Sequence, residues 1–303
     1  MKRISVSFER VHDTTGYLFS FAKCLSAALS CSPYKDFAED AIAASGFAFR
    51  MWVDGEQLCP SSTSIWDFAK QKEWVENSGL MCGYVQRLWG EDALEESRRR
   101  QAIDLLKRSI DDGVAGVVWD LSGCEWGLVI GYDDTEERLL TKTIQGREVS
   151  LPYEKLGALE IPILSVLTVT GERKKSEAQL LADTKRLAIS HLKGEEWCEN
   201  SKGLAAYDTL VEFLREKLTA DTAWNLEYLL GNYAALKWYA WKFFEKYGDR
   251  KWAEVYRKVY HAWQEAFDLV CGQDITAPDR KERLVTLLSE AKSAENNLIL
   301  AKE

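Results

Sequence analysis

The chain has 303 residues, with 39 Lys and Arg against 48 Asp and Glu, so its formal net charge is -9 at pH 7. An acidic chain without a Lys/Arg-rich run binds the phosphate backbone poorly, so we expect no nucleic-acid partner. No apolar stretch is long enough to span a membrane, and the first ten residues lack the apolar core of a secretory signal.

The cysteines and histidines point to a reducing compartment and away from zinc. The seven cysteines are scattered and form no C-x-x-C pair, which is typical of cytoplasmic proteins. None of the three histidines lies near a pair of cysteines in the sequence. We therefore expect a cytoplasmic protein without a metal or another cofactor.

The first half of the chain mixes helical and strand-like patterns. Apolar spacing predicts a strand at 4–8, helices at 17–29, 34–44 and 96–110, and strands at 48–53, 114–119, 126–132, 138–143 and 163–169. The connections between the last four strands are too short for helical crossovers, so they predict a mostly antiparallel sheet.

The second half is predicted to be entirely helical. Helical periodicity covers residues 176–193, 203–217, 222–247, 249–271 and 278–302. The sequence thus predicts an α+β domain at 1–172 and a helical domain at 173–303. Aromatic residues follow one helical face in steps of three and four, which indicates core packing or an aromatic-lined pocket: Trp252, Tyr256, Tyr260, Trp263 and Phe267.

Three stretches of the first half carry a recognisable pattern. They are CLSAAL at 24–29, SGFAFR at 45–50 and EWGLVIGYDD at 125–134. In this order they resemble the N-terminal family of butirosin biosynthesis protein H and its uncharacterised bacterial relatives. The resemblance covers roughly residues 15–170 and implies a papain-like fold of the type seen in bacteriocin-processing peptidases.

The resemblance also implies a catalytic arrangement that this chain lacks in part. In the family a thiol at a helix N-terminus is activated by a histidine, which a third polar residue orients. Carried onto this chain, Cys24 takes the thiol position, Glu125 stands where the peptidase branch has its histidine, and residues 140–143 offer no Asp or Asn. A carboxylate of pKa near 4.3 activates a thiol of pKa near 8.5 poorly, which weighs against catalysis. Cys24 is therefore open to two interpretations, as a nucleophile or as a small core residue.

Several polar positions have both a structural and a functional interpretation. Glu125 is a strand-edge carboxylate or a functional group. Arg50 is a surface or salt-bridging residue, or a partner for Glu125 or for an anionic substrate group. Asp120 either caps a hairpin or flanks a pocket around Glu125. The residues expected to bind a ligand in this pocket are Arg50, Asp120 and Trp126. The Asp133-Asp134 pair is better explained as a hairpin turn than as a metal site.

Two classes of function follow. The missing catalytic partners favour a pseudoenzyme that binds a small molecule or a peptide in a cleft around Glu125. The alternative is an acyl- or amide-transfer enzyme that uses Cys24, Glu125 or both. The sequence leaves open whether the chain is a homodimer.

Overall fold

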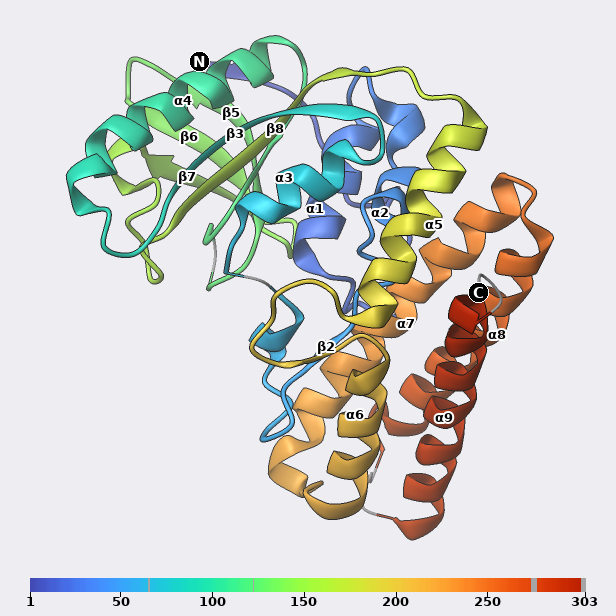
Figure 1. The fold of residues 1–303 in the computed structure, drawn as a ribbon. Coiled ribbons are helices and arrows are strands. Elements are labelled where there is room, and N and C mark those ends of the chain that lie inside the picture. The colour runs from blue at the N-terminus through green and yellow to red at the C-terminus, as the bar shows by residue number, and fades with distance from the viewer. Residues whose placement is uncertain (65, 122, 274–276, 301–303) are drawn as a thin grey trace. The chain divides into compact units, whose positions relative to one another are not determined.

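The chain forms two compact units in the computed structural model, which describes residues 1–64, 66–121, 123–273 and 277–300 (Figure 1). The first unit, here called unit 1, comprises Met1–His12, Ser20–Ala41 and Asp67–Lys175. The second, unit 2, comprises Asp13–Phe19, Ile42–Trp66 and Ser176–Glu303.

Unit 1 is built on a seven-stranded sheet in which every described pair of strands is antiparallel. The order is β3-β8-β4-β5-β6-β7, and β1 pairs with β5 beside this path. The strands are β1 (Lys2–Arg3), β3 (Leu80–Arg87), β4 (Gly116–Val118), β5 (Gly127–Asp133), β6 (Arg138–Lys142), β7 (Glu148–Pro152) and β8 (Leu164–Glu172). The predicted α+β class with an antiparallel sheet is confirmed.

A glycine in β5 allows the N-terminal strand to join the sheet. Gly131 lies opposite Arg3, and a Cβ atom at Gly131 would come within 2.5 Å of the Lys2 carbonyl oxygen. No larger residue fits there without displacing backbone. The Gly-Tyr element of the sequence motif therefore has a packing role at this strand pair.

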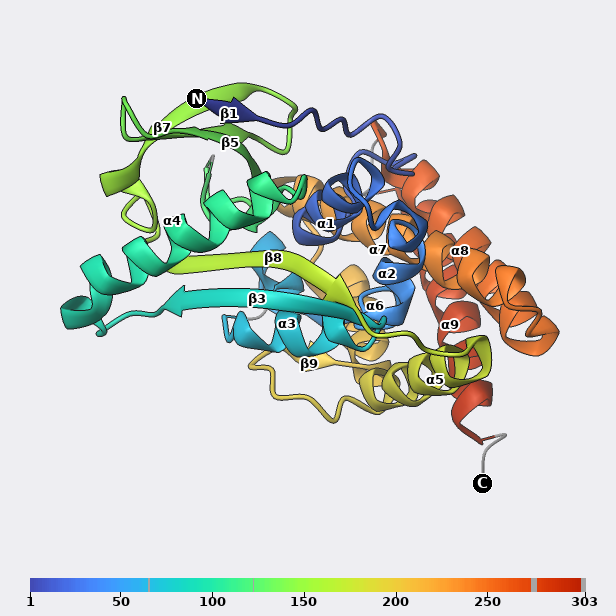
Figure 2. The ribbon, with the colours of Figure 1, turned by 90° about the horizontal axis from the view of Figure 1, so that it is seen from above.

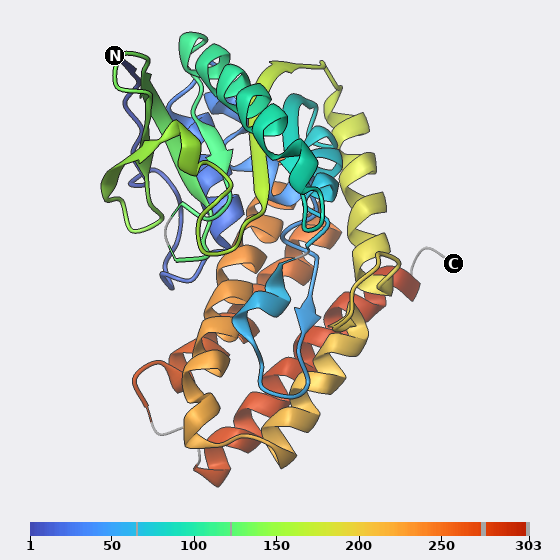
Figure 3. The same cartoon turned by 90° about the vertical axis from the view of Figure 1, so that its left-hand side faces the viewer.

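Helix α4 (Glu95–Asp111) covers the sheet with its apolar face, as Figures 2 and 3 show. Its buried residues, including Ala102 and Leu106, form one core with Val118, Val129 and Val166 of the strands. Two more helices pack on the strands of this unit: α1 (Ser20–Ser30) contacts β4 and β5, and α3 (Ala69–Glu76) contacts β3.

Unit 2 consists mainly of long helices. They are α5 (Glu177–Lys193), α6 (Leu204–Glu216), α7 (Ala223–Lys246), α8 (Arg250–Val270) and α9 (Pro278–Leu300). The short helix α2 (Asp40–Ala44) lies where the chain passes from unit 1 to unit 2. Within the described residues, no helix is long and apolar enough to cross a membrane.

Segments from the first half of the chain complete unit 2. Strand β2 (Trp52–Val53) pairs with β9 (Ser201–Lys202), and the Tyr233 hydroxyl donates to the Trp52 carbonyl and accepts from the Trp52 N–H at 2.7 and 2.8 Å. The Thr15 hydroxyl donates to the Gly231 carbonyl at 2.9 Å. The division at residue 172 therefore needs correction, because residues 13–19 and 42–66 belong to the unit that contains the helices.

The core of unit 2 contains an ion pair that is completely buried. Lys237 Nζ lies 2.7 Å from Glu295 Oε1, and neither side chain is exposed. The Tyr207 hydroxyl donates to Glu295 Oε2 at 2.7 Å and accepts from the Trp263 indole N–H at 3.0 Å. Most of the aromatic stripe of α8 is buried, so its interpretation as core packing is confirmed for Trp252, Tyr256, Trp263 and Phe267.

Several predicted boundaries are wrong for identifiable reasons. No strand lies at the described residues 4–8, and the first strand is β1 at Lys2–Arg3. The strand expected at 48–53 is only Trp52–Val53, because residues 46–50 form a turn closed by the Arg50 N–H on the Gly46 carbonyl. The prediction of an entirely helical second half is also wrong, since β9 lies at Ser201–Lys202.

Candidate functional site

Cys24 lies inside α1 and is completely buried. Burial raises the pKa of its thiol far above the usual value, and the negative charge of Glu125 raises it further, against a smaller effect of Lys23. A thiol that stays protonated is neither a good nucleophile nor a metal ligand. The structure thus supports the interpretation of Cys24 as a core residue.

Glu125 lies immediately before β5 and is half-buried. Its carboxylate accepts a hydrogen bond from the Ser20 hydroxyl and one from the Trp126 backbone N–H. Burial raises the pKa of the Glu125 carboxyl above its usual value, and these two hydrogen bonds act in the opposite direction. Both contacts are with neutral donors, so no basic side chain of the described residues contributes to its pKa.

Ser20 is the functional candidate that the sequence interpretation missed. It is the first residue of α1, one helical turn before Cys24, and is buried. The helix was predicted to begin at residue 17, which placed Ser20 at the end of its first turn rather than at its start. Serine is favoured at helix N-termini, and this preference is the signal that would have singled it out.

A strained loop positions Glu125. Asp120 and Cys124 both have positive φ angles, of 56° and 59°, which non-glycine residues rarely adopt. The Glu125 carbonyl accepts the Leu121 N–H at 3.2 Å and closes the loop. Such strain persists only where surrounding contacts impose it, and it is common at functional sites.

Asp120 supplies those contacts. Its Oδ1 accepts the Cys124 N–H at 3.1 Å, and its Oδ2 accepts the Ile161 N–H at 2.8 Å. Burial is the main cause that raises the pKa of the Asp120 carboxyl. Asp120 therefore ties the loop before Glu125 to the segment before β8, and its described contacts are with backbone.

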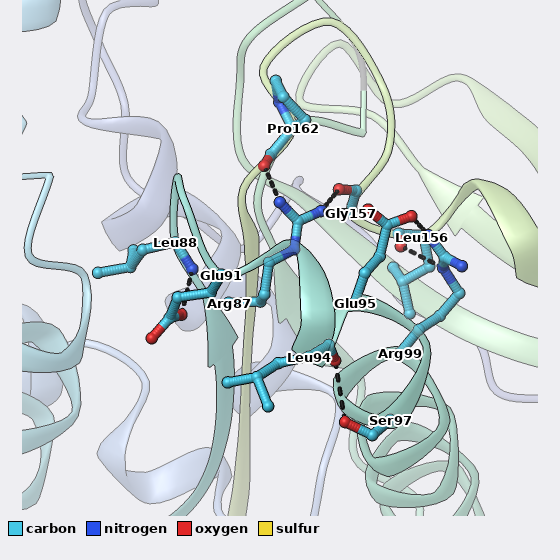
Figure 4. A network of polar contacts seen from close by, with 10 residues as sticks. All are labelled: Arg87, Leu88, Glu91, Leu94, Glu95, Ser97, Arg99, Leu156, Gly157 and Pro162. Carbon is cyan, nitrogen blue, oxygen red and sulfur yellow. Dashed lines mark hydrogen bonds and ion pairs between the residues drawn. The ribbon is translucent and has the colours of Figure 1, made fainter.

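The segment before β8 is held in turn by a buried arginine (Figure 4). Arg87, at the end of β3, donates to the Pro162 carbonyl at 2.5 Å and to the Gly157 carbonyl at 2.7 Å. Its guanidinium also lies 3.5 Å from Glu95, which pairs with Arg99. A chain of polar contacts thus runs from Arg87 through the 157–162 segment to Asp120 and the loop before Glu125.

Trp126 belongs to an aromatic cluster in unit 1. Its ring centroid lies 4.9 Å from those of Phe21 and Phe68 and 5.3 Å from that of Trp119. Trp126 is 2% exposed, and its indole N–H has no hydrogen-bond partner among the described residues. The ring is therefore part of the core of unit 1, and its role in ligand binding stays a prediction.

Arg50 lies in unit 2 and is buried, so its interpretation as a surface residue is wrong. Its guanidinium carbon lies 4.0 Å from the ring centroid of Trp52, and Nη2 donates to the Thr63 carbonyl at 3.0 Å. Burial lowers the pKa of Arg50 to about 10. Arg50 and Glu125 are in different units, and their pairing stays a prediction.

The Asp133-Asp134 pair has the contacts of a hairpin turn. Asp133 accepts the Thr135 N–H at 3.0 Å, and Asp134 pairs with Lys107 and accepts the Tyr153 hydroxyl at 2.9 Å. The described residues contain no group of three or more His, Cys, Asp or Glu side chains placed to hold a metal ion.

No protein-family model matches the chain, and no curated protein sequence matches it.

Proposed function

We propose that the chain is a papain-like pseudoenzyme that binds a small molecule or a peptide at Glu125. The buried, protonated thiol of Cys24 supports the loss of thiol catalysis. The position of Glu125 at the start of a central strand, facing the first residue of α1, supports a site at the place where the resemblance puts the catalytic pair.

The hydrogen-bonding capacity of Glu125 carries this proposal. A carboxylate offers about four lone-pair positions, and the Ser20 hydroxyl and the Trp126 N–H occupy two of them. Because Glu125 is only half-buried, its remaining acceptor positions are open to hydration, and donors of a ligand can replace that water. The matching ligand therefore presents N–H groups, as an amine, an amide or a peptide backbone does.

A series of five-carbon probes tests the proposal. Pentane-1,5-diamine, pentanediamide and pentanedioate have similar length and differ in their end groups. We expect the diamine and the diamide, but not the dicarboxylate, to raise the melting temperature of the wild type. At about ten times Kd the gain is roughly 1.4 kcal/mol, or a rise of about 2–4 °C.

Two variants locate the binding. Glu125→Gln should abolish the response, whereas Glu136→Gln, at an exposed position after β5, should respond like the wild type. An equal response of Glu125→Gln, or no response of the wild type to the diamine and the diamide, would contradict binding at Glu125.

The contact between Ser20 and Glu125 favours one second candidate, an acyl- or amide-transfer enzyme in which Glu125 acts as the base. This function needs a nucleophile that reacts in the native state, at Ser20 or at Cys24. Under the binding proposal, iodoacetamide labels the exposed Cys59 and Cys271 and leaves Cys24 intact, and a fluorophosphonate leaves Ser20 intact. Peptide mass spectrometry that finds either adduct in the native protein would favour the enzyme instead.

A further inference from the structure

A groove runs between α8 and α9 within unit 2, where the two helices lie side by side (Figures 1 and 2). Its volume is about 440 Å³. Its lining includes Arg257, His261 and Glu265 of α8, with Arg283, Leu287 and Glu290 of α9.

The groove has an apolar floor and a charged rim. The floor consists of alanines and Leu287, of which Ala262, Leu287 and Ala291 are buried. The charged residues of the rim are exposed. An apolar centre within a polar rim is the usual anatomy of a protein–protein interface, whereas small-molecule sites enclose most of their ligand.

Two charges of the rim have no ion-pair partner among the described residues. Arg283 is paired with Glu265 across the groove at 2.6 Å, and Lys258 is paired with Glu254 along α8 at 3.2 Å. Arg257 on α8 and Glu290 on α9 remain. One wall of the groove therefore offers an unpaired guanidinium and the other an unpaired carboxylate.

We propose that a second copy of this chain docks on the groove between α8 and α9 and forms a two-fold symmetric dimer. In this dimer Arg257 of one copy pairs with Glu290 of the other, and two-fold symmetry forms the same pair a second time with the roles of the copies exchanged. A patch that carries one unpaired charge of each sign is complementary to itself under this operation. A partner with a surface of a single sign would leave one of the two charges repelled.

The lengths of the helices suit such an interface. With 21 and 23 residues, α8 and α9 extend about 31 and 34 Å. The exposed ridge of α8 follows steps of about four residues, through Arg257, His261 and Glu265, and fits the groove of a second copy as ridges fit grooves between helices. Two helix pairs of this length can bury the roughly 800 Å² per partner of a stable dimer.

Charge-reversal variants of the full chain test the dimer by sedimentation velocity across the micromolar range. We expect the wild type to be dimeric. Arg257→Glu and Glu290→Arg each place two like-charged pairs in the interface, and each should weaken the dimer by tenfold or more. The double variant Arg257→Glu/Glu290→Arg restores both pairs and should dimerise like the wild type.

Mixing the two single variants gives the sharpest result. A heterodimer of Arg257→Glu with Glu290→Arg contains two opposite-charge pairs, so an equimolar mixture should dimerise although neither variant does alone. Lys251→Glu and Glu282→Arg, exposed on the same helices outside the groove, are the controls and should dimerise like the wild type. A monomeric wild type, single variants that dimerise normally, or a mixture that stays monomeric would each overturn the proposal.

Discussion

The charge of Glu125 acts on Cys24 in the opposite direction from a catalytic histidine. An imidazolium stabilises a thiolate, whereas a carboxylate raises the thiol pKa and keeps the sulfur protonated. Glu125 therefore does not favour a thiolate at Cys24, and it is a polar group that accepts hydrogen bonds. Because its own pKa is raised, Glu125 also makes its surroundings sensitive to pH.

The stability of the protein should depend on the protonation of Glu125. Because its folded-state pKa is raised, the folded state holds a proton at pH values where the unfolded chain has released it. The contribution of Glu125 is therefore present below its usual pKa and is lost as the pH rises through its folded-state pKa. We expect the melting temperature of Glu125→Gln to fall less steeply than that of the wild type over this window.

Two other carboxylates serve as references for the pH dependence of the melting temperature, Asp120 and Glu136. Asp120 also has a raised pKa and remains in the variant, so part of the slope should persist. Glu136→Gln should retain the wild-type slope in the same melting series. A slope in Glu125→Gln that equals that of the wild type would show that Glu125 is not ionised differently in the folded state.

The sequence predicts the position of Glu125 but not its surroundings. Glu125 can be located because the strand motif that follows it is local and regular. Ser20 could not be predicted in this way, because its role depends on where α1 begins and on a contact across more than a hundred residues. Arg50 is misjudged because a charged residue that ends an apolar run gives no local sign that aromatic rings enclose it.

At the level of elements, the loop before Glu125 depends on a neighbouring segment for its shape. Asp120 bonds to Ile161, and Arg87 bonds to Gly157 and Pro162 on the same segment. A change at Arg87 should therefore reach Glu125 without touching it.

Arg87→Met tests this dependence. Loss of the buried guanidinium leaves two carbonyl groups without their donor, and we expect a destabilisation of about 3 kcal/mol. We also expect weaker binding of pentane-1,5-diamine at temperatures where the variant is still folded. The exposed Arg100→Met, which loses only an ion pair along α4, should cost about 0.5 kcal/mol. Unchanged chemical denaturation of Arg87→Met would contradict the support described for this loop.

The helices of unit 2 were the elements most fully predicted, since long amphipathic periods are the strongest local signal. Strands β3 and β7 were missed for a physical reason. Both lie at the ends of the sheet order, and β7 exposes three of its five residues, so neither shows a clear alternation of apolar and polar residues.

At the level of the whole molecule, the chain passes between the two units several times. Unit 2 takes Trp52 and Thr15 from the first half of the sequence, and its helices bond to both. A local pattern cannot reveal this organisation, because the partners of these residues lie far away in the sequence. A simple division at residue 172 separates residues that fold together.

Fragments test this organisation. The fragment 176–303 lacks β2 and residues 13–19, so we expect it to unfold well below the melting temperature of the full chain, with weak near-ultraviolet circular dichroism. Mixing it with the fragment 1–175 should recover the native signal, because all partners are then present. Cooperative unfolding of 176–303 alone at the temperature of the full chain would show that the helices do not need the earlier segments.

The pairing of β2 with β9 also has a consequence during synthesis. The apolar run from Phe47 to Val53 leaves the ribosome roughly 150 residues before β9 follows it. At ordinary translation rates this interval is on the order of ten seconds, during which Phe47, Phe49 and Trp52 have no native partner from the second half of the chain. A nascent segment with this content is the kind that a chaperone such as a ribosome-associated holdase binds. We therefore expect residues 47–53 to be open to such a chaperone until the second half of the chain has been made.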